Sequence, residues 1–160
     1  VPWQHKLRDL VTELDFISLH TYPVWEYKHI HEALDYTKEN VASVARLYPG
    51  KSIVITEAGW CTHSNGRGMN AEHAVQELQA LYYQDLMDWT RAEGLLCFVF
   101  EAFDEPWKGS PDPLEPEKHW GLFTVDRKPK LVMQALFADL DPDLAPQAAN
   151  SAPLATESIP

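Results

Sequence analysis

Apolar residues in this chain follow two patterns: short continuous runs, and longer stretches in which they recur every three or four positions. The continuous runs cover residues 15–22, 52–57 and 95–103, and their length and β-branched or aromatic content favour buried strands over helices. Between the first two runs, the positions spaced for one helix face are Ile30, Leu34, Thr37, Val41, Val44 and Tyr48. This order predicts a strand, an amphipathic helix that stops at Pro49-Gly50, and a second strand.

Two further helices are predicted in the second half of the chain. Asn70 is placed to cap one that Gly94 closes, and its apolar positions are Val75, Leu78, Tyr82, Leu86 and Trp89. After the third run come a proline-rich loop, a short strand or ordered turn at residues 120–125, and a helix whose first turn holds Pro129. The apolar positions of this last helix are Leu131, Val132, Ala135, Leu136 and Leu140. Because residues 141–160 are rich in Pro, Ala and Ser without an aromatic, we expect a domain over residues 1–140 and a disordered tail.

The regular alternation of strands and helices predicts an α/β fold with a parallel sheet. Two parallel architectures compete, the open doubly wound sheet and the closed (β/α)8 barrel. Neither a dinucleotide-binding nor a P-loop glycine motif follows any of the runs, which argues against a nucleotide site. The full strand number of a barrel is also missing, so the hydrophobic pattern alone leaves the architecture open.

Composition excludes several classes of function. The 160 residues contain 13 Lys and Arg against 24 Asp and Glu, a formal net charge of -11, which repels nucleic acid. No apolar run reaches the ~18 residues of a membrane helix, so we expect no membrane partner. The histidines lack ligand partners at metal-binding spacing, and we expect neither a metal nor another cofactor. The two cysteines, Cys61 and Cys97, are expected to stay unbridged, since Glu57 and Glu101 on level strands would put them ~26 Å apart.

Polar residues end all three apolar runs. His20 and Tyr22 end the first, Glu57 the second, and Glu101 and Glu105 the third. In β/α folds the working residues gather at the carboxyl ends of the strands, and carboxylates there are costly to desolvate unless they are paired or used. Ion pairing offers a structural alternative for each acid, such as a bridge between Glu101 and Lys108 or Arg67.

Strand alternation refines this picture, because every second residue shares a face. We expect Ser18, His20 and Tyr22 on one face, Ile53, Ile55 and Glu57 on another, and Val99, Glu101, Phe103 and Glu105 on a third. If those faces converge, the acids lie together. The loops after these strands also carry aromatic residues, namely Trp25, Tyr27, Trp60, Trp107 and Trp120. Paired acids beside flat apolar rings suit the binding and cleavage of sugars.

Two motifs resemble glycoside hydrolase family 17, a family of retaining β-1,3-glucanases and related glucanosyltransferases on a (β/α)8 barrel. Ile55-Thr-Glu-Ala-Gly-Trp60 is similar to its nucleophile segment. The stretches at residues 100–108 (FEAFDEPWK) and 117–123 (EKHWGLF) are similar to its last-strand signature. The sequence of residues 19–23 (LHTYP) is more similar to bacterial members than to plant members.

The resemblance implies roles for individual residues. Glu57 matches the catalytic nucleophile at the end of strand seven, and Tyr22 matches an aromatic residue that lines the sugar cleft. Glu105, Lys108 and Glu117 match acidic and basic residues around the site, and Trp60 is expected to contact the sugar. Glu101 and His20 are candidates for an acid or a supporting group.

The chain departs from the family in its length. The resemblance assigns only strands six to eight, and the family's general acid, in an Asn-Glu pair that ends strand four, would lie before residue 1. We therefore expect a partial barrel whose inward residues Ile53, Ile55, Val99 and Phe103 need a cover, either a second copy or a missing barrel half. Three functional hypotheses remain: a β-1,3-glucan hydrolase, a glucanosyltransferase, and a catalytically silent partial barrel that binds glucan or self-assembles. The substrate favours a secreted or periplasmic location.

Overall fold

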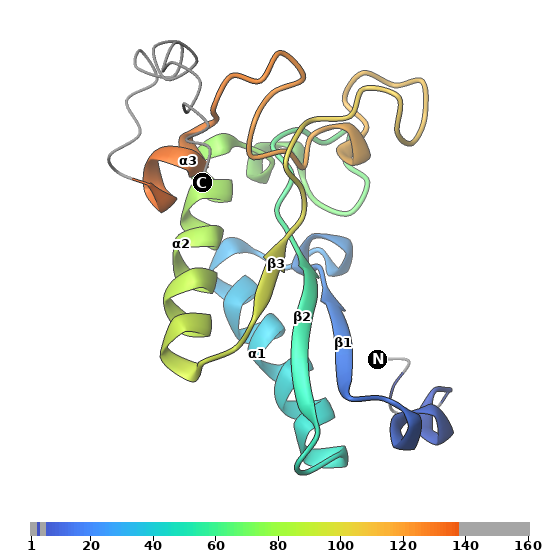
Figure 1. The fold of residues 1–160 in the computed structure, drawn as a ribbon. Coiled ribbons are helices and arrows are strands. Elements are labelled where there is room, and N and C mark those ends of the chain that lie inside the picture. Colours follow the sequence, from blue (N-terminus) through green and yellow to red (C-terminus); the bar gives the residue numbers. More distant parts are fainter. Residues whose placement is uncertain (1–2, 4–5, 138–160) are drawn as a thin grey trace, which may run out of the picture.

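A three-stranded parallel sheet with helices on one face forms the frame of the computed structural model, which describes residues 3 and 6–137 (Figure 1). The strands are β1 (Phe16–Thr21), β2 (Ser52–Ala58) and β3 (Cys97–Val99), in the order β1-β2-β3. The helices are α1 (Ile30–Leu47), α2 (Gln76–Glu93) and α3 (Leu131–Leu136). Short 3-10 turns lie at Arg8–Glu13, Pro23–Glu26, Ala71–His73 and Pro116–Lys118. The expected parallel α/β arrangement is confirmed.

Helix α1 has the buried stripe that its apolar spacing predicts. The buried positions are Ile30, Ala33, Thr37, Val41 and Val44. A capping box starts the helix, since the His29 ring accepts a hydrogen bond from the backbone while Glu32 accepts one from the His29 N–H. The Thr37 hydroxyl lies 3.0 Å from the hydroxyl of Tyr82 in α2, so the two helices are joined by a polar contact inside the apolar layer.

Two helix starts differ from the prediction. Asn70 precedes the short turn Ala71–His73, and α2 begins only at Gln76. The reason is that the intervening turn is held by the core, because the His73 carbonyl accepts a hydrogen bond from the Trp60 indole at 3.0 Å. Helix α3 begins at Leu131, because Pro129 pairs with Phe123 in an isolated antiparallel bridge. Leu140 and the proposed tail at 141–160 lie outside the described residues, so the domain boundary stays a prediction.

The third strand is shorter than its apolar run. Residues 95–103 were expected to be extended, but β3 covers only Cys97–Val99. Beyond it the backbone changes partner: the Glu101 N–H donates to the carbonyl of Trp120, and Leu122 and Phe123 donate back to residues 101 and 102. The expectation that Val99, Glu101, Phe103 and Glu105 share one face is therefore wrong, because strand alternation stops at Val99.

A bulge in β2 sets the direction of the Glu57 side chain. Leu19 pairs with Ile55, but its neighbour His20 pairs with Glu57, so Thr56 is an extra residue in the ladder. The extra residue shifts the alternation by one position. Glu57 consequently faces the same side as His20, whereas strict alternation predicts that it shares a face with Ile55.

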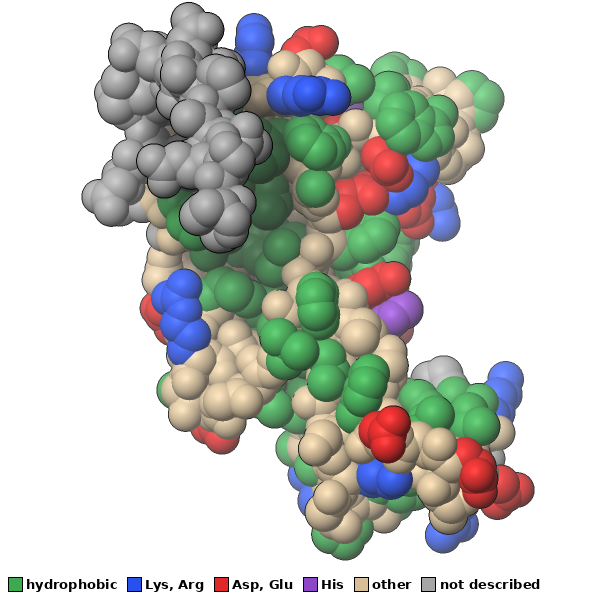
Figure 2. All heavy atoms as spheres, viewed as in Figure 1, with side chains coloured by type: hydrophobic (Ala, Val, Ile, Leu, Met, Phe, Trp, Pro, Cys, Tyr) green, Lys and Arg blue, Asp and Glu red, His purple; other side chains and the backbone are tan. Residues whose placement is uncertain are grey.

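The uncovered face of the sheet carries different apolar residues from those expected. Ile55 is fully buried and Ile53 and Val99 pack against the core, so these three lie toward the helices. The exposed apolar residues of the strands and the segments next to them are Phe16, Leu96, Phe98 and Phe103. Figure 2 shows hydrophobic side chains along the sheet in the view of Figure 1, where the strands lie in front of α1. Of the four expected residues, only Phe103 is exposed.

The two cysteines are free thiols far apart along the sheet. Ala58 is level with Val99, which corrects the assumed level of Glu57 with Glu101. The cysteines then differ by about five residues, or ~17 Å, still beyond the ~7 Å limit for a disulfide. Burial raises the pKa of Cys61 and of Cys97 to about 12, so neither is an activated nucleophile.

Candidate active site

Glu57 is the centre of a polar cluster at the carboxyl end of β2. The Tyr22 hydroxyl donates a hydrogen bond to Glu57 Oε2 at 2.6 Å. His20 Nδ1 lies 3.2 Å from the same oxygen, because the bulge puts the two residues side by side. Both contacts fall on Oε2, which leaves Oε1 without a hydrogen-bond partner among the described residues. A carboxylate fixed through one oxygen with the other open has the form that a nucleophile requires.

Tyr22 is held as a proton donor to this carboxylate. Burial raises the pKa of the Tyr22 hydroxyl above its ordinary value, and the hydrogen bond to Glu57 and the nearby charge of Glu117 act in the same direction. The Tyr22 ring packs edge-on against Trp120, with 5.2 Å between ring centroids. The tyrosine therefore stays protonated, and packing against Trp120 fixes the orientation of its ring.

Lys108 joins two further acids of the loop after β3. Its ammonium lies 2.6 Å from Glu101 Oε2 and also pairs with Glu105. Burial raises the pKa of Glu101, although the hydrogen bond from Lys108 opposes this. Burial alone would lower the pKa of Lys108, but its hydrogen bonds to Glu101 and Glu105 outweigh that effect and raise it. The ion pair between Glu101 and Lys108, weighed above as a structural alternative, is thus present, while Arg67 pairs elsewhere.

Phe100 connects the two groups of charged residues. The Tyr22 ring meets the Phe100 ring edge-on at 5.8 Å between centroids, and the Lys108 ammonium lies 4.5 Å from the centre of the same ring. Glu101 Oε1 is buried and has no hydrogen-bond partner among the described residues. The arrangement places the Glu57 carboxylate, a fixed cation and a buried acid around one aromatic ring.

The aromatic residues divide into core and surface. Trp60, which was expected to contact the sugar, is fully buried and packs against Tyr82. Trp120 is buried beneath Tyr22. The positions of Trp60 and Trp120 after strand ends do not predict their burial, because both loops fold back over the core. Tyr27 and Trp107 are exposed and remain available to a ligand.

The sequence patterns gave no sign of the contacts that join the three loops around the site. Arg67, after β2, pairs with the buried Glu115 after β3 and stacks over Trp25 after β1, 4.9 Å from that ring. Lys130 is buried and pairs with Asp104 at 2.7 Å. Each pair is separated by more than 20 positions, so no local spacing signals it.

Replacing Glu115 with Gln is expected to destabilise the fold in a pH-dependent way. Burial would raise the pKa of Glu115, but Ser110 and Arg67 outweigh it and hold the pKa below its ordinary value. A depressed carboxyl pKa contributes stability above the unfolded-state pKa and loses it as the pH falls through the folded-state pKa. At pH 7 we expect a loss of about 1–2 kcal/mol in the free energy of unfolding, modest because Arg67 is solvent-exposed.

Urea unfolding at pH 7 and at pH 3 measures this effect. The difference between wild type and Glu115→Gln should shrink at pH 3, and the exposed pair variant Glu39→Gln, which also loses an arginine partner, should show little change at either pH. A Glu115 effect that is equal at both pH values would contradict the ion-pair account.

The described part of the chain has neither a candidate metal site nor a candidate membrane-spanning helix. No group of three or more His, Cys, Asp or Glu side chains there can hold a metal ion. None of the helices in the described ranges has the length and hydropathy to cross a bilayer.

Comparison with known proteins identifies the family. The family model of the BtgE/BtgC glycoside hydrolase domain matches residues 2–121. The chain belongs to this glycoside hydrolase family. The matched range, together with the similarity to solved glycoside hydrolase family 17 structures given below, confirms the resemblance to that family.

Curated relatives of this BtgE/BtgC domain are glucan-degrading enzymes. A glucan 1,3-beta-glucosidase of Arthroderma benhamiae is 30% identical over 126 residues, covering 72% of this chain and 41% of that relative. A probable glucan endo-1,3-beta-glucosidase btgC of Aspergillus flavus is 29% identical over 138 residues, covering 76% of this chain and 20% of that relative. The chain spans less than half the length of these relatives.

Solved structures give the same relationship. The glycoside hydrolase family 17 beta-1,3-glucanosyltransferase of Rhizomucor miehei superposes with a TM-score of 0.66 at 30% identity, over 76% of this chain and 43% of that one. An endo-laminarinase from Formosa gives a TM-score of 0.68 at 33% identity, over 86% of this chain and 43% of that one. The likeness therefore extends from motifs to the arrangement of strands and helices.

Proposed function

We propose that this chain carries the nucleophile half of a retaining β-1,3-glucan glycosidase site. Glu57 Oε1 attacks the anomeric carbon, the bond to the leaving oxygen breaks, and a glycosyl-enzyme ester forms that water then hydrolyses. The proposal rests above all on the convergence of Tyr22 and His20 on Glu57 Oε2, which leaves one carboxylate oxygen open. The relatives named for 1,3-beta-glucan supply the substrate class.

In this proposal the residues around Glu57 hold the sugar. Lys108 is placed to bind sugar hydroxyls, with Glu101 and Glu105 holding its ammonium and Glu117 near Tyr22. We propose that Glu101 holds Lys108 in place and does not act as the general acid, because Lys108 already binds its carboxylate. The leaving oxygen then receives its proton from a group outside the described residues.

A glucanosyltransferase uses the same steps with a sugar hydroxyl in place of water as the acceptor. The similarity to the Rhizomucor miehei enzyme makes transfer the second candidate. Product analysis by mass spectrometry separates the two, since transfer lengthens the oligosaccharide and hydrolysis shortens it. For either reaction we propose a secreted or periplasmic location, because β-glucan is usually found outside the cytoplasm.

Covalent trapping tests the nucleophile without needing the general acid. A 2-deoxy-2-fluoro-laminaribiosyl donor with a dinitrophenolate leaving group needs no protonation and forms a slowly hydrolysed ester. We expect intact-mass analysis to show one added glycosyl group and peptide mapping to place it on Glu57. The same donor with an unactivated alkyl leaving group should react far more slowly.

The control for trapping is a carboxylate outside the cluster. Glu72→Gln, at an exposed position, should label like wild type, whereas Glu57→Gln should not label. Labelling of a different carboxylate would overturn the assignment of Glu57, and no labelling of the folded protein would favour a silent partial barrel.

We further propose that additional β/α units cover the open sheet face, either from a second copy of this chain or from a complementary barrel part. The support is the exposure of Phe16, Leu96 and Phe98 and the outer edges of β1 and β3, which pair with no other strand of the described residues. Each such side chain gains roughly 1.5–3 kcal/mol on burial. Exposed strand edges also pair readily with other chains.

Light scattering of the purified chain at micromolar concentration measures this assembly. We expect a mass above that of the 18.2 kDa monomer. The variant Phe98→Lys should move the mass toward the monomer, while Leu81→Lys on α2 should leave it unchanged. A stable monomer that binds no hydrophobic dye would contradict the need for a cover.

A further inference from the structure

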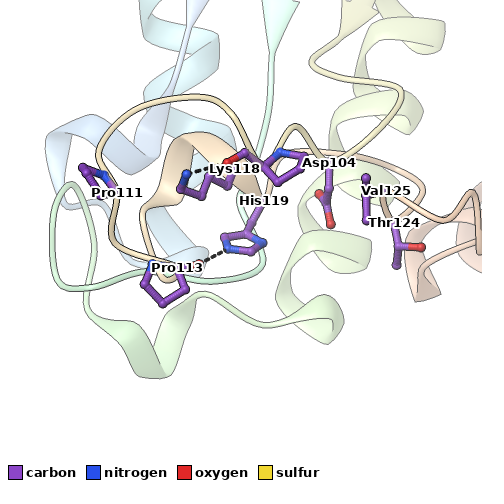
Figure 3. Close-up of a pocket in the computed structure, with 8 residues that line it drawn as sticks. Asp104, Pro111, Pro113, Lys118, His119, Thr124 and Val125 are labelled. Atoms are coloured by element: carbon purple, nitrogen blue, oxygen red, sulfur yellow. Dashed lines mark hydrogen bonds between the residues drawn. The ribbon is translucent and has the colours of Figure 1, made fainter.

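A second concave site lies among the loops after β3, apart from Glu57. The cavity has a volume of about 360 Å³, within the range of small-molecule sites. Its apolar walls are Pro106, Pro111, Pro113 and Val125. In Figure 3, Pro111 lies on one side and Thr124 and Val125 on the other, with Lys118 and His119 between them.

The cavity walls are fixed by internal hydrogen bonds. Lys118 Nζ donates to the Pro106 carbonyl at 2.6 Å, and His119 Nε2 lies 2.8 Å from the Pro113 carbonyl. These two contacts tie the proline-rich loop to the segment that follows it. A ligand would therefore bind to a preformed surface, and ordering that surface on binding would cost little conformational entropy.

Polar groups in the cavity have capacity left for a ligand. The Lys118 ammonium has three N–H donors, and one of them is used by Pro106. Asp104 Oδ1 accepts from Lys130 and from the Gly121 N–H, and Oδ2 has no hydrogen-bond partner among the described residues. The Thr124 hydroxyl oxygen accepts from the Lys128 N–H and keeps its own proton to donate.

The polar groups of the cavity suit a neutral polyhydroxylated ligand. Lys118 and Asp104 line the cavity, and the Asp104 carboxylate is already paired with the buried Lys130, so the lining offers hydrogen-bond donors and acceptors together, as sugar hydroxyls require. Alternating donors and acceptors between apolar walls match the hydroxyl edge and the C–H face of a pyranose ring. A glucosyl unit fits within the volume of the cavity.

We propose that this cavity is a second glucan-binding site, which holds a glucosyl unit of the polymer away from the bond that reacts. The proposal rests on the proposed β-glucan function. The cavity shares no residue with the cluster around Glu57, and its lining residues make no hydrogen bond to that cluster's His20, Tyr22 or Glu57. A polymer bound at two points dissociates more slowly than one bound at either point alone.

Backbone amide shift mapping by NMR tests the proposal, with laminaribiose and laminaritriose as the probes. We expect shifts at residues 104, 118, 119, 124 and 125 in addition to shifts near Glu57. The variant Val125→Trp fills the cavity, and we expect it to weaken binding there by about tenfold or more without changing the trapping of Glu57. The matched control Leu81→Trp adds the same ring at an exposed position on α2.

The outcomes separate the two proposals. Shifts near Glu57 alone would overturn the second site and leave the proposed function intact. Shifts in the cavity that Val125→Trp removes, together with failed trapping of Glu57, would support the second site and overturn the nucleophile. Shifts that Val125→Trp and Leu81→Trp alter equally would also overturn the second site.

Discussion

Replacement of Glu57 with Gln is expected to reduce glycosyl transfer from an activated β-1,3-glucosyl donor by several orders of magnitude. The amide has the volume of the carboxylate and can still accept the hydrogen bond from Tyr22, so the surrounding structure should remain. An uncharged amide cannot form the glycosyl ester. Release of dinitrophenolate, followed by absorbance, measures the rate.

Two controls make this result specific to the nucleophile. Unfolding of Glu57→Gln by urea should match wild type within about 1 kcal/mol, because the side chain is partly exposed and only its charge is lost. Glu105→Gln removes one of the carboxylates on Lys108 and should reduce the rate to a smaller extent. Retention of a tenth of the wild-type rate by Glu57→Gln would rule out Glu57 as the nucleophile.

The substitution Gly59→Ala should cause a large loss of stability. A Cβ atom at this position would lie 2.4 Å from the Phe100 carbonyl oxygen and 2.9 Å from the Trp120 ring. The carbonyl cannot yield easily, since it accepts a hydrogen bond from the buried Tyr83 hydroxyl at 2.8 Å. We expect the free energy of unfolding to fall by about 3 kcal/mol or more, and trapping of Glu57 to fall with it.

Gly50→Ala is the matched control for this steric effect. Gly50 has a φ of +87° with nothing within 4 Å of the added atom, so alanine there costs only backbone strain of about 1 kcal/mol. Urea unfolding of both variants gives the comparison. Equal losses for the two substitutions would show that the space around Gly59 is not limiting.

The chain order and the strand ends were predictable because they depend on local patterns. Hydrophobic runs with polar ends located His20, Tyr22, Glu57 and Glu101 correctly at one end of the sheet. The directions of the side chains were not predictable, since one extra residue at Thr56 reverses the alternation. Nothing in the residue types of β2 marks that position.

The loops were the least predictable part of the site. Trp60 and Trp120 follow strand ends but are buried, because the loops that carry them are held against the core by distant partners. Gln79 of α2, for example, donates hydrogen bonds to the carbonyls of Trp60 and Trp120. Such contacts join segments about 20 to 40 positions apart, and only the three-dimensional arrangement reveals them.

The bulge in β2 means that the orientation of Glu57 depends on a residue count and not on a residue type. Thr56 can be exchanged for another residue without turning Glu57, but a strand of the same length without the bulge would pair Glu57 with Thr21 and direct the carboxylate into the helix layer. The strand is thus tolerant of substitution at Thr56 and intolerant of a change in register. In the loop at residues 61–70 the constraint is instead on residue type: Gly68 must stay small because the Trp25 ring occupies the space of a Cβ atom.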